Sequence, residues 1–527
     1  MSKTKVNNPI LKGFNPDPSM ICVGDDYYIA TSTFEWFPGV QIHHSKDLVN
    51  WELISRPLNT KEHLNMIGNP SSGGIWAPAI SYHNGIYYLI FTDVKHWSTD
   101  PFKDTHNYLT MATDIKGPWS KPVYINSSGF DPSLFHDDDG RKWFLNMEWD
   151  YRKTGIKQFT GILLQEYDEV EKKLIGKPER IFSGTALGVT EAPHIMKKDG
   201  YYYLITAEGG TSYQHAVTIA RSKHIKGPYE VHPDNPLVTS SNTDNPIQKA
   251  GHGSICQSKD GKWYMAHLCG RPLPNSNRCI LGRETAIEEI VWKNNWPYLK
   301  HGINQPAPYI EVLESVAVNE RKEYNYTFKN HDFLTDFQTL RVPYCDELFS
   351  IDRRPGFLRI FGKESLLSKH EQAIICRRQQ HFCFEAETTL EFKPETFQQM
   401  AGLIYRYNED NQFYLMMTYN EEHNQNELMV MKFDDKQFSF ITGNQVLIIK
   451  TNEVSLKIVV NYDQGQFYYK SNGQFVKIGD SFDTSILSDE YASPMGFTGA
   501  FVGMACQDLN QQKNYADFKS FTYRVID

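Results

Sequence analysis

The sequence predicts an all-β protein in which a five-bladed β-propeller (residues 1–318) is followed by a β-sandwich of concanavalin-like or jelly-roll type (residues 319–527). Two observations carry this prediction: a repeated hairpin pattern in the first half, and strict apolar–polar alternation in the second. A chain of 527 residues is also too long for a single compact core, which agrees with two domains.

The repeat in the first half is a turn of Asp, Asn or Gly, followed by aromatic residues and an apolar run. The last aromatic residues of the copies are spaced by 60, 56, 59 and 61 positions. They are Tyr28, Tyr88, Phe144, Tyr203 and Tyr264. Each copy is typical of a β-hairpin, and about 60 residues accommodate four strands and a long loop. Because helical periodicity is scarce, we expect five four-stranded blades in a ring.

One position on the entering strand of each hairpin lies 11, 11, 13, 12 and 12 residues before these aromatic anchors. These positions hold Asp17, Ala77, Asp131, Glu191 and His252. We expect them to be equivalent in the propeller and to face its axial cavity. Three carboxyl groups there repel one another and lose solvent, so at least one pKa should be raised. Two carboxyl groups with separated pKa values are what the cleavage of a glycosidic bond requires.

The alternative for these acids is turn chemistry, because Asp often stabilises a turn that precedes Pro. Taken singly, each Asp-Pro pair is more often structural than catalytic. The position of all three acids in phase with the repeat favours the catalytic interpretation.

The second half begins where proline and charge accumulate, over residues 305–325, and where the hairpin repeat stops. Apolar side chains then alternate with charged or polar ones, between Phe382 and Phe392 and again between Leu456 and Tyr462. Such alternation is typical of strands with one solvated face, so this half predicts a β-sandwich. Sugar binding and a purely structural role are both open for this domain.

Composition and charge exclude several classes of function. The 54 Lys and Arg residues are outnumbered by 63 Asp and Glu, and the net charge of −9 argues against a nucleic-acid-binding protein. The polar start of the chain and the lack of any stretch of about 18 apolar residues predict neither a signal peptide nor a membrane span. The eight cysteines are scattered without a C-x-x-C motif, so we expect reduced thiols in a cytoplasmic protein.

Nine segments carry a resemblance to a known family. They are Gly13–Ser19, Ser32–Val40, Gly73–Pro78, Phe130–Ser133, Thr190–His194, Gly251–Ser254 and Leu281–Thr285 in the first domain, and Arg354–Arg359 and Phe497–Gly503 in the second. In these segments the sequence closely resembles glycoside hydrolase family 43, and specifically its two-domain bacterial β-xylosidases. The resemblance covers essentially the whole chain.

The resemblance implies an inverting exo-glycosidase that releases xylose from the non-reducing end of short β-1,4-xylo-oligosaccharides. Asp17 is then the general base that activates water, and Glu191 is the general acid. Asp131 is the third acid, which orients Glu191 and keeps its pKa high. For inversion, the two carboxyl groups should lie about 6.5–9.5 Å apart. Relatives also imply a homo-oligomer, either a dimer or a tetramer.

The resemblance also implies residues that bind the substrate. Arg283 matches a substrate-binding arginine, and the less favoured alternative is that it only relieves repulsion among the acids. His252 matches a cavity histidine that is a hydrogen-bonding partner or lies close to an ion. No cofactor is required, and a calcium ion near His252 is compatible with the resemblance but not demanded by the spacing. Trp76 and Phe34 match residues that stack on sugar, with burial in the core as the alternative, and Phe501 matches a second-domain residue that closes the pocket.

Five alternative functions are weighed against this prediction. Within the family, an α-L-arabinofuranosidase or an enzyme with both activities is the closest rival, and an endo-arabinanase is disfavoured by the expected closure of the pocket. A retaining fructosidase-type enzyme would need an Arg-Asp-Pro segment, which the sequence lacks. A non-catalytic carbohydrate-binding protein or a protein scaffold would have no reason to keep three acids in register. One departure from relatives is Ala79, which stands where they often carry His and so removes one polar group near Trp76.

Overall fold

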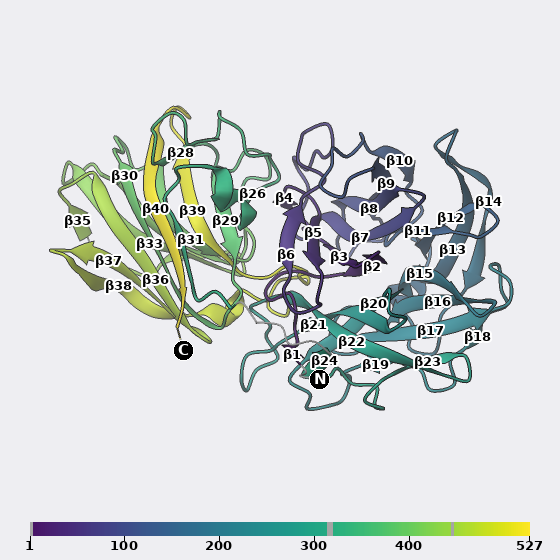
Figure 1. Ribbon diagram of the computed structural model, residues 1–527. Helices are drawn as coiled ribbons and strands as arrows, with labels where there is room; N and C mark the ends of the chain where they lie inside the picture. The colour runs from purple at the N-terminus through teal and green to yellow at the C-terminus, as the bar shows by residue number, and fades with distance from the viewer. Residues whose placement is uncertain (1–3, 313–319, 444–446, 527) are drawn as a thin grey trace.

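The computed structural model describes residues 4–312, 320–443 and 447–526 and contains two all-β domains, which confirms the predicted fold class (Figure 1). The propeller occupies one side of the molecule and the sandwich the other. The boundary predicted between residues 318 and 319 lies outside the described residues. Within the described ranges, no helix has the length and the apolar character that crossing a membrane would require.

Five sheets of consecutive antiparallel strands form the blades. The first blade consists of β2 (Ser19–Val23), β3 (Asp26–Thr31), β5 (Gln41–Ser45) and β6 (Glu52–Ser55). The second consists of β7 (Gly74–His83), β8 (Ile86–His96), β9 (Asp104–Ala112) and β10 (Val123–Asn126). The third consists of β11 (Ser133–His136), β12 (Lys142–Trp149), β13 (Phe159–Asp168) and β14 (Lys173–Phe182). The fourth consists of β15 (Glu191–Lys198), β16 (Tyr201–Glu208), β17 (Ala216–Ser222) and β18 (Glu230–Val231), and β19 (Val238–Thr239) also pairs with β17. The fifth consists of β20 (Gln248–Gln257), β21 (Trp263–Gly270), β22 (Arg283–Lys293) and β23 (Trp296–Leu299).

The innermost strands of the blades contact one another in a closed ring, in the order β2, β7, β11, β15, β20 and back to β2. The start of the chain fastens this ring. β1 (Thr4–Asn7) pairs with β24 (Tyr309–Val312), which follows the fifth blade, and Leu11 forms a β-bridge with Thr285 in that blade. The predicted hairpins are therefore blades of one propeller, and their inner strands surround one axis.

The sandwich consists of an eight-stranded and a nine-stranded antiparallel sheet in the described part. The first sheet contains β25 (Glu323–Tyr326), β27 (Phe349–Ser350), β28 (Leu358–Phe361), β30 (Cys383–Phe392), β36 (Glu453–Asn461), β37 (Gln464–Ser471), β38 (Gln474–Asp483) and β40 (Tyr515–Val525). The second contains β4 (Trp36–Phe37), β26 (Phe337–Leu340), β29 (Ile374–Arg378), β31 (Gln399–Arg406), β32 (Gln412–Asn420), β33 (Gln425–Asp434), β34 (Gln437–Phe440), β35 (Leu447–Ile449) and β39 (Phe501–Asp508). Three short 3₁₀ helices complete the described elements: η1 (Gly155–Gln158), η2 (His331–Thr335) and η3 (Thr484–Ile486).

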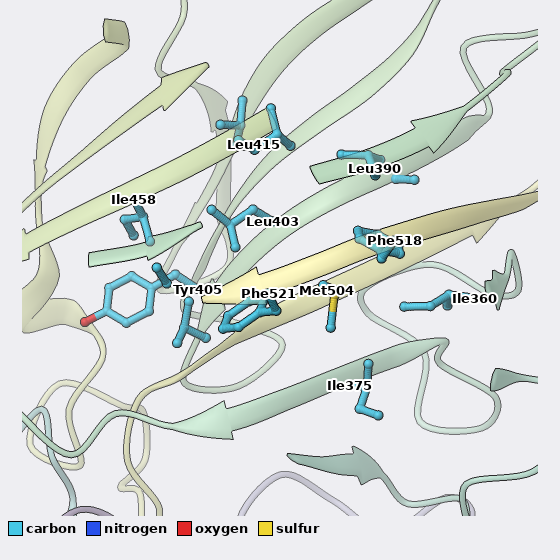
Figure 2. Packing of buried hydrophobic residues seen from close by; sticks show 14 of the residues in the cluster. Ile360, Ile375, Leu390, Leu403, Tyr405, Leu415, Ile458, Met504, Phe518 and Phe521 are labelled. Carbon is cyan, nitrogen blue, oxygen red and sulfur yellow. The ribbon is translucent and has the colours of Figure 1, made fainter. Parts of the chain in front are cut away.

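The alternation seen in the sequence places one apolar face of each sheet in the core. Along β30, every second side chain is buried, from Phe384 to Phe392, and along β36 the same holds from Val454 to Val460. Figure 2 shows Leu390 and Ile458 of the first sheet together with Leu403 of the second, all fully buried in one cluster. Each such side chain stabilises the fold by about 1.5–3 kcal/mol through burial of apolar surface.

The two domains share a sheet. β4 leaves the first blade between β3 and β5 and pairs with β26 at the edge of the nine-stranded sheet. Trp36 on β4 is fully buried and stacks on Phe501 of β39 with 3.9 Å between ring centroids. Propeller and sandwich are therefore joined through backbone pairing and aromatic packing beside the axial cavity.

Candidate active site

A pocket of about 330 Å³ lies where the innermost strands of the blades converge. It is lined by Asp17, Phe34, Trp76, Trp97, Ser98, Thr99, Lys103, Phe130, Asp131, Trp149, Phe159, Val189, Glu191, Gly210, Thr211, His252 and Arg283 of the propeller, and by Pro494, Met495 and Phe497 of the sandwich. All predicted site residues except Phe501 thus meet in one cavity. A larger cavity of about 650 Å³ runs along the domain interface and contains none of the three predicted acids.

The same backbone irregularity occurs just before the innermost strand, or within its first half, in every blade. Its residue has a positive φ, between 36° and 56°, which is uncommon for residues other than glycine. These residues are Asp17, Ala77, Asp131, Ala192 and His252. Strained backbone of this kind is concentrated at functional sites. Here one such residue stands at the equivalent place of each blade, and three of the five, Asp17, Asp131 and His252, line the pocket.

The equivalence predicted for the fourth blade was therefore wrong by one residue. Ala192, and not Glu191, corresponds to Asp17, because strand pairing resumes two residues later at His194 as it does at Ser19. Glu191 instead corresponds to Trp76, the residue before the turn. Counting from the aromatic anchors could not reveal this, because the hairpin turns differ in length between blades. Glu191 reaches the same pocket from the neighbouring position.

Asp17 is held as a carboxylate by its partners. Its Oδ2 accepts a hydrogen bond from Ser32 Oγ at 2.6 Å, and its Oδ1 lies 3.2 Å from Arg283 Nη1. His252 Nδ1 lies 3.6 Å from the same oxygen. Burial alone would raise the pKa of Asp17, but the positive charge of Arg283, the nearby His252 ring and the Ser32 hydrogen bond together lower that pKa below its ordinary value. Asp17 is therefore ionised at neutral pH.

Glu191 has the opposite protonation state. Burial and the negative charge of Asp17 raise the pKa of Glu191 to about 8, although Arg283 and Lys103 act in the other direction. Burial, with the charges of Glu191 and Asp17, raises the pKa of Asp131 well above its ordinary value. The backbone amide of Ala192 donates a hydrogen bond to Asp131, which ties this acid to the residue next to Glu191. The pocket thus holds the ionised Asp17 beside the protonated Glu191 and a third acid, Asp131, whose pKa is raised.

These pKa values predict the pH dependence of a reaction that needs ionised Asp17 and protonated Glu191. We expect kcat/KM to be level across the weakly acidic range, since the pKa of Asp17 lies below its ordinary value of 3.8. Activity should fall as the pH rises through about 8, where Glu191 loses its proton. Initial rates from pH 4 to pH 10 test this. A basic limb that persists unchanged in Glu191→Gln would contradict the assignment.

Aromatic rings form one wall of the pocket. Trp76 contacts Phe34 and Phe497, with ring centroids 5.9 and 5.4 Å apart, and its indole Nε1 donates to the carbonyl of Ser72 at 2.8 Å. Phe130 meets Trp76 edge to face at 5.4 Å. Trp76 and Phe34 are nearly fully buried, so they serve both as core and as pocket lining. Flat apolar surfaces of this kind suit the apolar faces of a sugar ring.

The prediction that Phe501 closes the pocket was wrong. Phe501 is the first residue of β39, is fully buried, and packs on Trp36 and Phe14 behind the pocket. Phe497, four residues earlier, lines the pocket instead. Its backbone carbonyl accepts hydrogen bonds from Arg283 Nε and Nη2 at 3.2 and 2.8 Å. The sandwich does contribute to the site, but through the loop before β39.

Substitution of these two phenylalanines should separate their roles. We expect Phe497→Ala to lower kcat/KM roughly 10- to 100-fold, because the pocket loses about 1.5–3 kcal/mol of apolar contact with the substrate. Phe501→Ala should instead lower the free energy of unfolding by about 3–5 kcal/mol, with a smaller change in kcat/KM of the folded protein. Steady-state kinetics combined with thermal melts measure both. Equal kinetic effects would contradict the placement.

His252 lies at the pocket, as predicted, and burial lowers its pKa, so its ring is neutral at pH 7. Its neighbours do not form a metal site by geometry: among the described residues, no three His, Cys, Asp or Glu side chains are grouped closely enough to hold an ion. The calcium ion considered from the sequence thus gains no support from side-chain ligands.

Several residues of the site were not predicted from the sequence. Ser32, besides its bond to Asp17, accepts a hydrogen bond from the amide of Ala77 at 2.8 Å and so links two blades. Thr211 Oγ1 accepts from Arg283 Nη1 at 2.9 Å. Lys103 lies over the Trp149 ring at 4.5 Å and is partly responsible for the charge around Glu191. Ser32 lies within Ser32–Val40, one of the segments that resemble the family. Thr211 and Lys103 lie in loops that differ from blade to blade, so no repeated sequence pattern marks them.

Comparison with known protein families gives two matches that together span most of the chain. A family model described as glycosyl hydrolases family 43 matches residues 6–297. A second, described as the beta xylosidase C-terminal concanavalin A-like domain, matches residues 325–524. These limits agree with the propeller and the sandwich.

Similar proteins match over their whole length. A "Beta-xylosidase" of Bacillus subtilis (strain 168) is 49% identical, with 99% of each chain covered. A "Xylosidase/arabinosidase 43B" of Humicola insolens is also 49% identical, over 99% of this chain and 98% of that protein. Among solved structures, a xylan beta-1,4-xylosidase from Bacillus halodurans C-125 superimposes with a TM-score of 0.95, at 48% identity, over 98% of this chain and 100% of the other.

Proposed function

The chain belongs to glycosyl hydrolase family 43, and on this premise we propose that it is an inverting exo-β-xylosidase, which releases xylose from the non-reducing end of short β-1,4-xylo-oligosaccharides. The observation that carries this proposal is the presence of ionised Asp17 and protonated Glu191 in one pocket. A base and an acid with separated pKa values are the two groups that single-displacement hydrolysis needs. The names of the relatives supply the substrate class.

In the proposed reaction, the terminal xylose occupies the pocket with its anomeric carbon between Asp17 and Glu191. Asp17 accepts a proton from a water molecule, which attacks the anomeric carbon. Glu191 donates its proton to the glycosidic oxygen, so that the bond to the leaving sugar breaks. Arg283 keeps Asp17 ionised before the attack. Asp131 accepts a hydrogen bond from the amide of Ala192 and so lies fixed beside Glu191, which it would orient.

The shape of the pocket supports action at a chain end. The cavity of about 330 Å³ is small, and Pro494, Met495 and Phe497 of the sandwich form part of its wall. A xylan chain that passed straight through would need a groove open at both ends. The sandwich thus favours a pocket for one terminal sugar.

The expected homo-oligomer, a dimer or tetramer, and the expected cytoplasmic location stay predictions. The cysteines support the cytoplasmic location, because all eight are free thiols and five of them are buried. A cytoplasmic enzyme of this kind would act on short oligosaccharides rather than on polymeric xylan.

The name of the Humicola insolens relative makes arabinofuranosidase activity the second candidate. Initial rates on xylobiose, xylotriose and 4-nitrophenyl α-L-arabinofuranoside distinguish the two. We expect xylose to be released from both xylo-oligosaccharides with a kcat/KM at least tenfold above that for the arabinoside. Hydrolysis of the arabinoside alone would replace the proposed substrate, and no hydrolysis of any of them would contradict an enzymatic role.

A further inference from the structure

The loop Asp489–Thr498, here named the closing loop, connects the sandwich to the pocket and is fixed at both of its ends. Tyr407 Oη donates to Asp489 Oδ1 at 2.5 Å and accepts from the amide of Thr498 at 3.2 Å, so one hydroxyl joins the two ends. Near its end, Phe497 contacts the propeller through its amide, which donates to Ser72 Oγ at 3.2 Å. The two ends of the loop are therefore joined to each other, and its last residues are joined to the propeller.

A buried lysine of the fifth blade holds the other side of this loop. Lys249 on β20 is 2% exposed, and its Nζ forms an ion pair with Glu490 Oε1 and lies 3.9 Å from Asp489 Oδ2. Glu490 Oε2 accepts a hydrogen bond from the amide of Cys279 at 2.8 Å. An ion pair removed from water is retained only with such close partners, because an unpaired buried charge is strongly unfavourable. The pair thus fastens the closing loop to the strand that also carries His252.

The closing loop in turn holds Arg283. Two of the hydrogen bonds of the Arg283 guanidinium go to the carbonyl of Phe497, and its Nη1 lies 3.2 Å from Asp17 Oδ1. The preceding residue, Gly282, has φ +72°, and a side chain there would collide with the carbonyl of Thr498. The arginine beside the proposed base is therefore oriented by backbone of the other domain.

From this chain of contacts we infer that Lys249 and Glu490 are positioning residues for hydrolysis: their buried ion pair locks the closing loop so that the Phe497 carbonyl holds Arg283 against Asp17. Neither residue lines the pocket. They act on the reaction only through Phe497 and Arg283. The expected loss of activity rests on the proposed function, whereas the expected loosening of the closing loop does not.

The kinetic test compares Lys249→Met, Glu490→Gln and the double variant with the parent enzyme on 4-nitrophenyl β-D-xyloside. We expect kcat/KM to fall roughly 10- to 100-fold, as for a small misplacement of a catalytic group. The acid limb of the kcat/KM profile should move to higher pH by about one unit, because Asp17 loses part of the stabilisation from Arg283. The other charged or titratable groups that face Asp17, which are His252, His215, Glu191 and Asp131, remain unchanged in these variants. Lys249→Arg should retain most of the activity and the parental acid limb.

A remote ion pair serves as the matched control. Arg359 Nε and Asp517 Oδ1 are 2.7 Å apart in the sandwich, away from the closing loop. Arg359→Met also breaks an ion pair with a buried carboxylate, but its pH profile should superimpose on that of the parent. The double variant Lys249→Met with Glu490→Gln removes both charges of this ion pair. Asp489 loses Lys249 as a neighbour but keeps the hydrogen bond from Tyr407 Oη, and the variant should still show the displaced acid limb.

Amide hydrogen exchange gives a readout that does not depend on the substrate. Peptides that cover residues 489–498 should exchange at least tenfold faster in Lys249→Met than in the parent or in Arg359→Met. The inference is overturned if activity falls with an unmoved acid limb, or if exchange in the closing loop stays at the parental rate. An inactive parent with faster exchange in Lys249→Met would overturn the proposed function and leave the role of the ion pair intact.

Discussion

Replacement of Asp17 by asparagine is expected to lower kcat on xylobiose by roughly 10²- to 10⁴-fold, the usual contribution of a general base. The amide keeps the shape of the side chain and can still accept the hydrogen bond from Ser32 Oγ. It cannot accept a proton from water at any accessible pH. Arg283 retains its bonds to Phe497 and Thr211, so the site should remain ordered.

Two controls distinguish lost chemistry from lost structure in this variant. Thermal melts should show a folded protein, because the substitution removes one buried charge and no apolar contact. In the smaller variant Asp17→Ala, azide should enter the space of the base and attack an activated aryl β-xyloside, which yields α-xylosyl azide. An Asp17→Asn protein with kcat within threefold of the parent would remove Asp17 from the role of base.

Replacement of Glu191 by glutamine should affect substrates according to their leaving groups. For xylobiose, kcat should fall roughly 10²- to 10⁴-fold, since the departing sugar oxygen needs a proton. For 2,4-dinitrophenyl β-D-xyloside, whose leaving group departs as an anion without assistance, the loss should be much smaller. The basic limb of the pH profile near 8 should also disappear, because the group that titrates there is gone.

The variant Asp131→Asn serves as a comparison for Glu191→Gln. Asp131 is held by the amide of Ala192 and is expected to orient Glu191 rather than to transfer a proton. Because Asp131 acts through Glu191, its substitution should also impair the sugar substrate more than the dinitrophenyl substrate, but the basic limb of the pH profile should remain, since Glu191 is still present to titrate. A Glu191→Gln variant should melt no lower than the parent above pH 8, where the parent must ionise a buried acid and the variant need not. Equal losses on both substrates for Glu191→Gln would contradict its role as the acid.

The architecture could be predicted from the sequence because it depends on local patterns. A turn followed by aromatic residues marks each blade, and period-two burial marks β30 and β36. The three acids could be found because each stands at or beside the same turn of an innermost strand. The sequence did not reveal that Glu191 lies one residue before the position equivalent to Asp17, because the hairpin turns vary in length. Only the pairing of β15 with β16 shows this offset.

The contacts between the domains could not be predicted. Phe497 and Phe501 lie in one short segment, and their roles depend on register: Phe501 pairs with Arg378 and Arg406 inside the nine-stranded sheet, while Phe497 precedes that strand. The pairing of β4 with β26 joins residues about 300 positions apart in the chain. Such contacts follow from how two complete domains pack, and no short motif encodes them.

Proton NMR of the purified protein with xylobiose tests the central claim most directly. In the first minutes, before mutarotation, the anomeric signals show which form of xylose leaves the pocket. Attack by water activated at Asp17, on the face opposite Glu191, predicts that α-xylose appears first. If β-xylose appears first, the enzyme retains configuration, and the assignment of Asp17 as a base acting through water is contradicted.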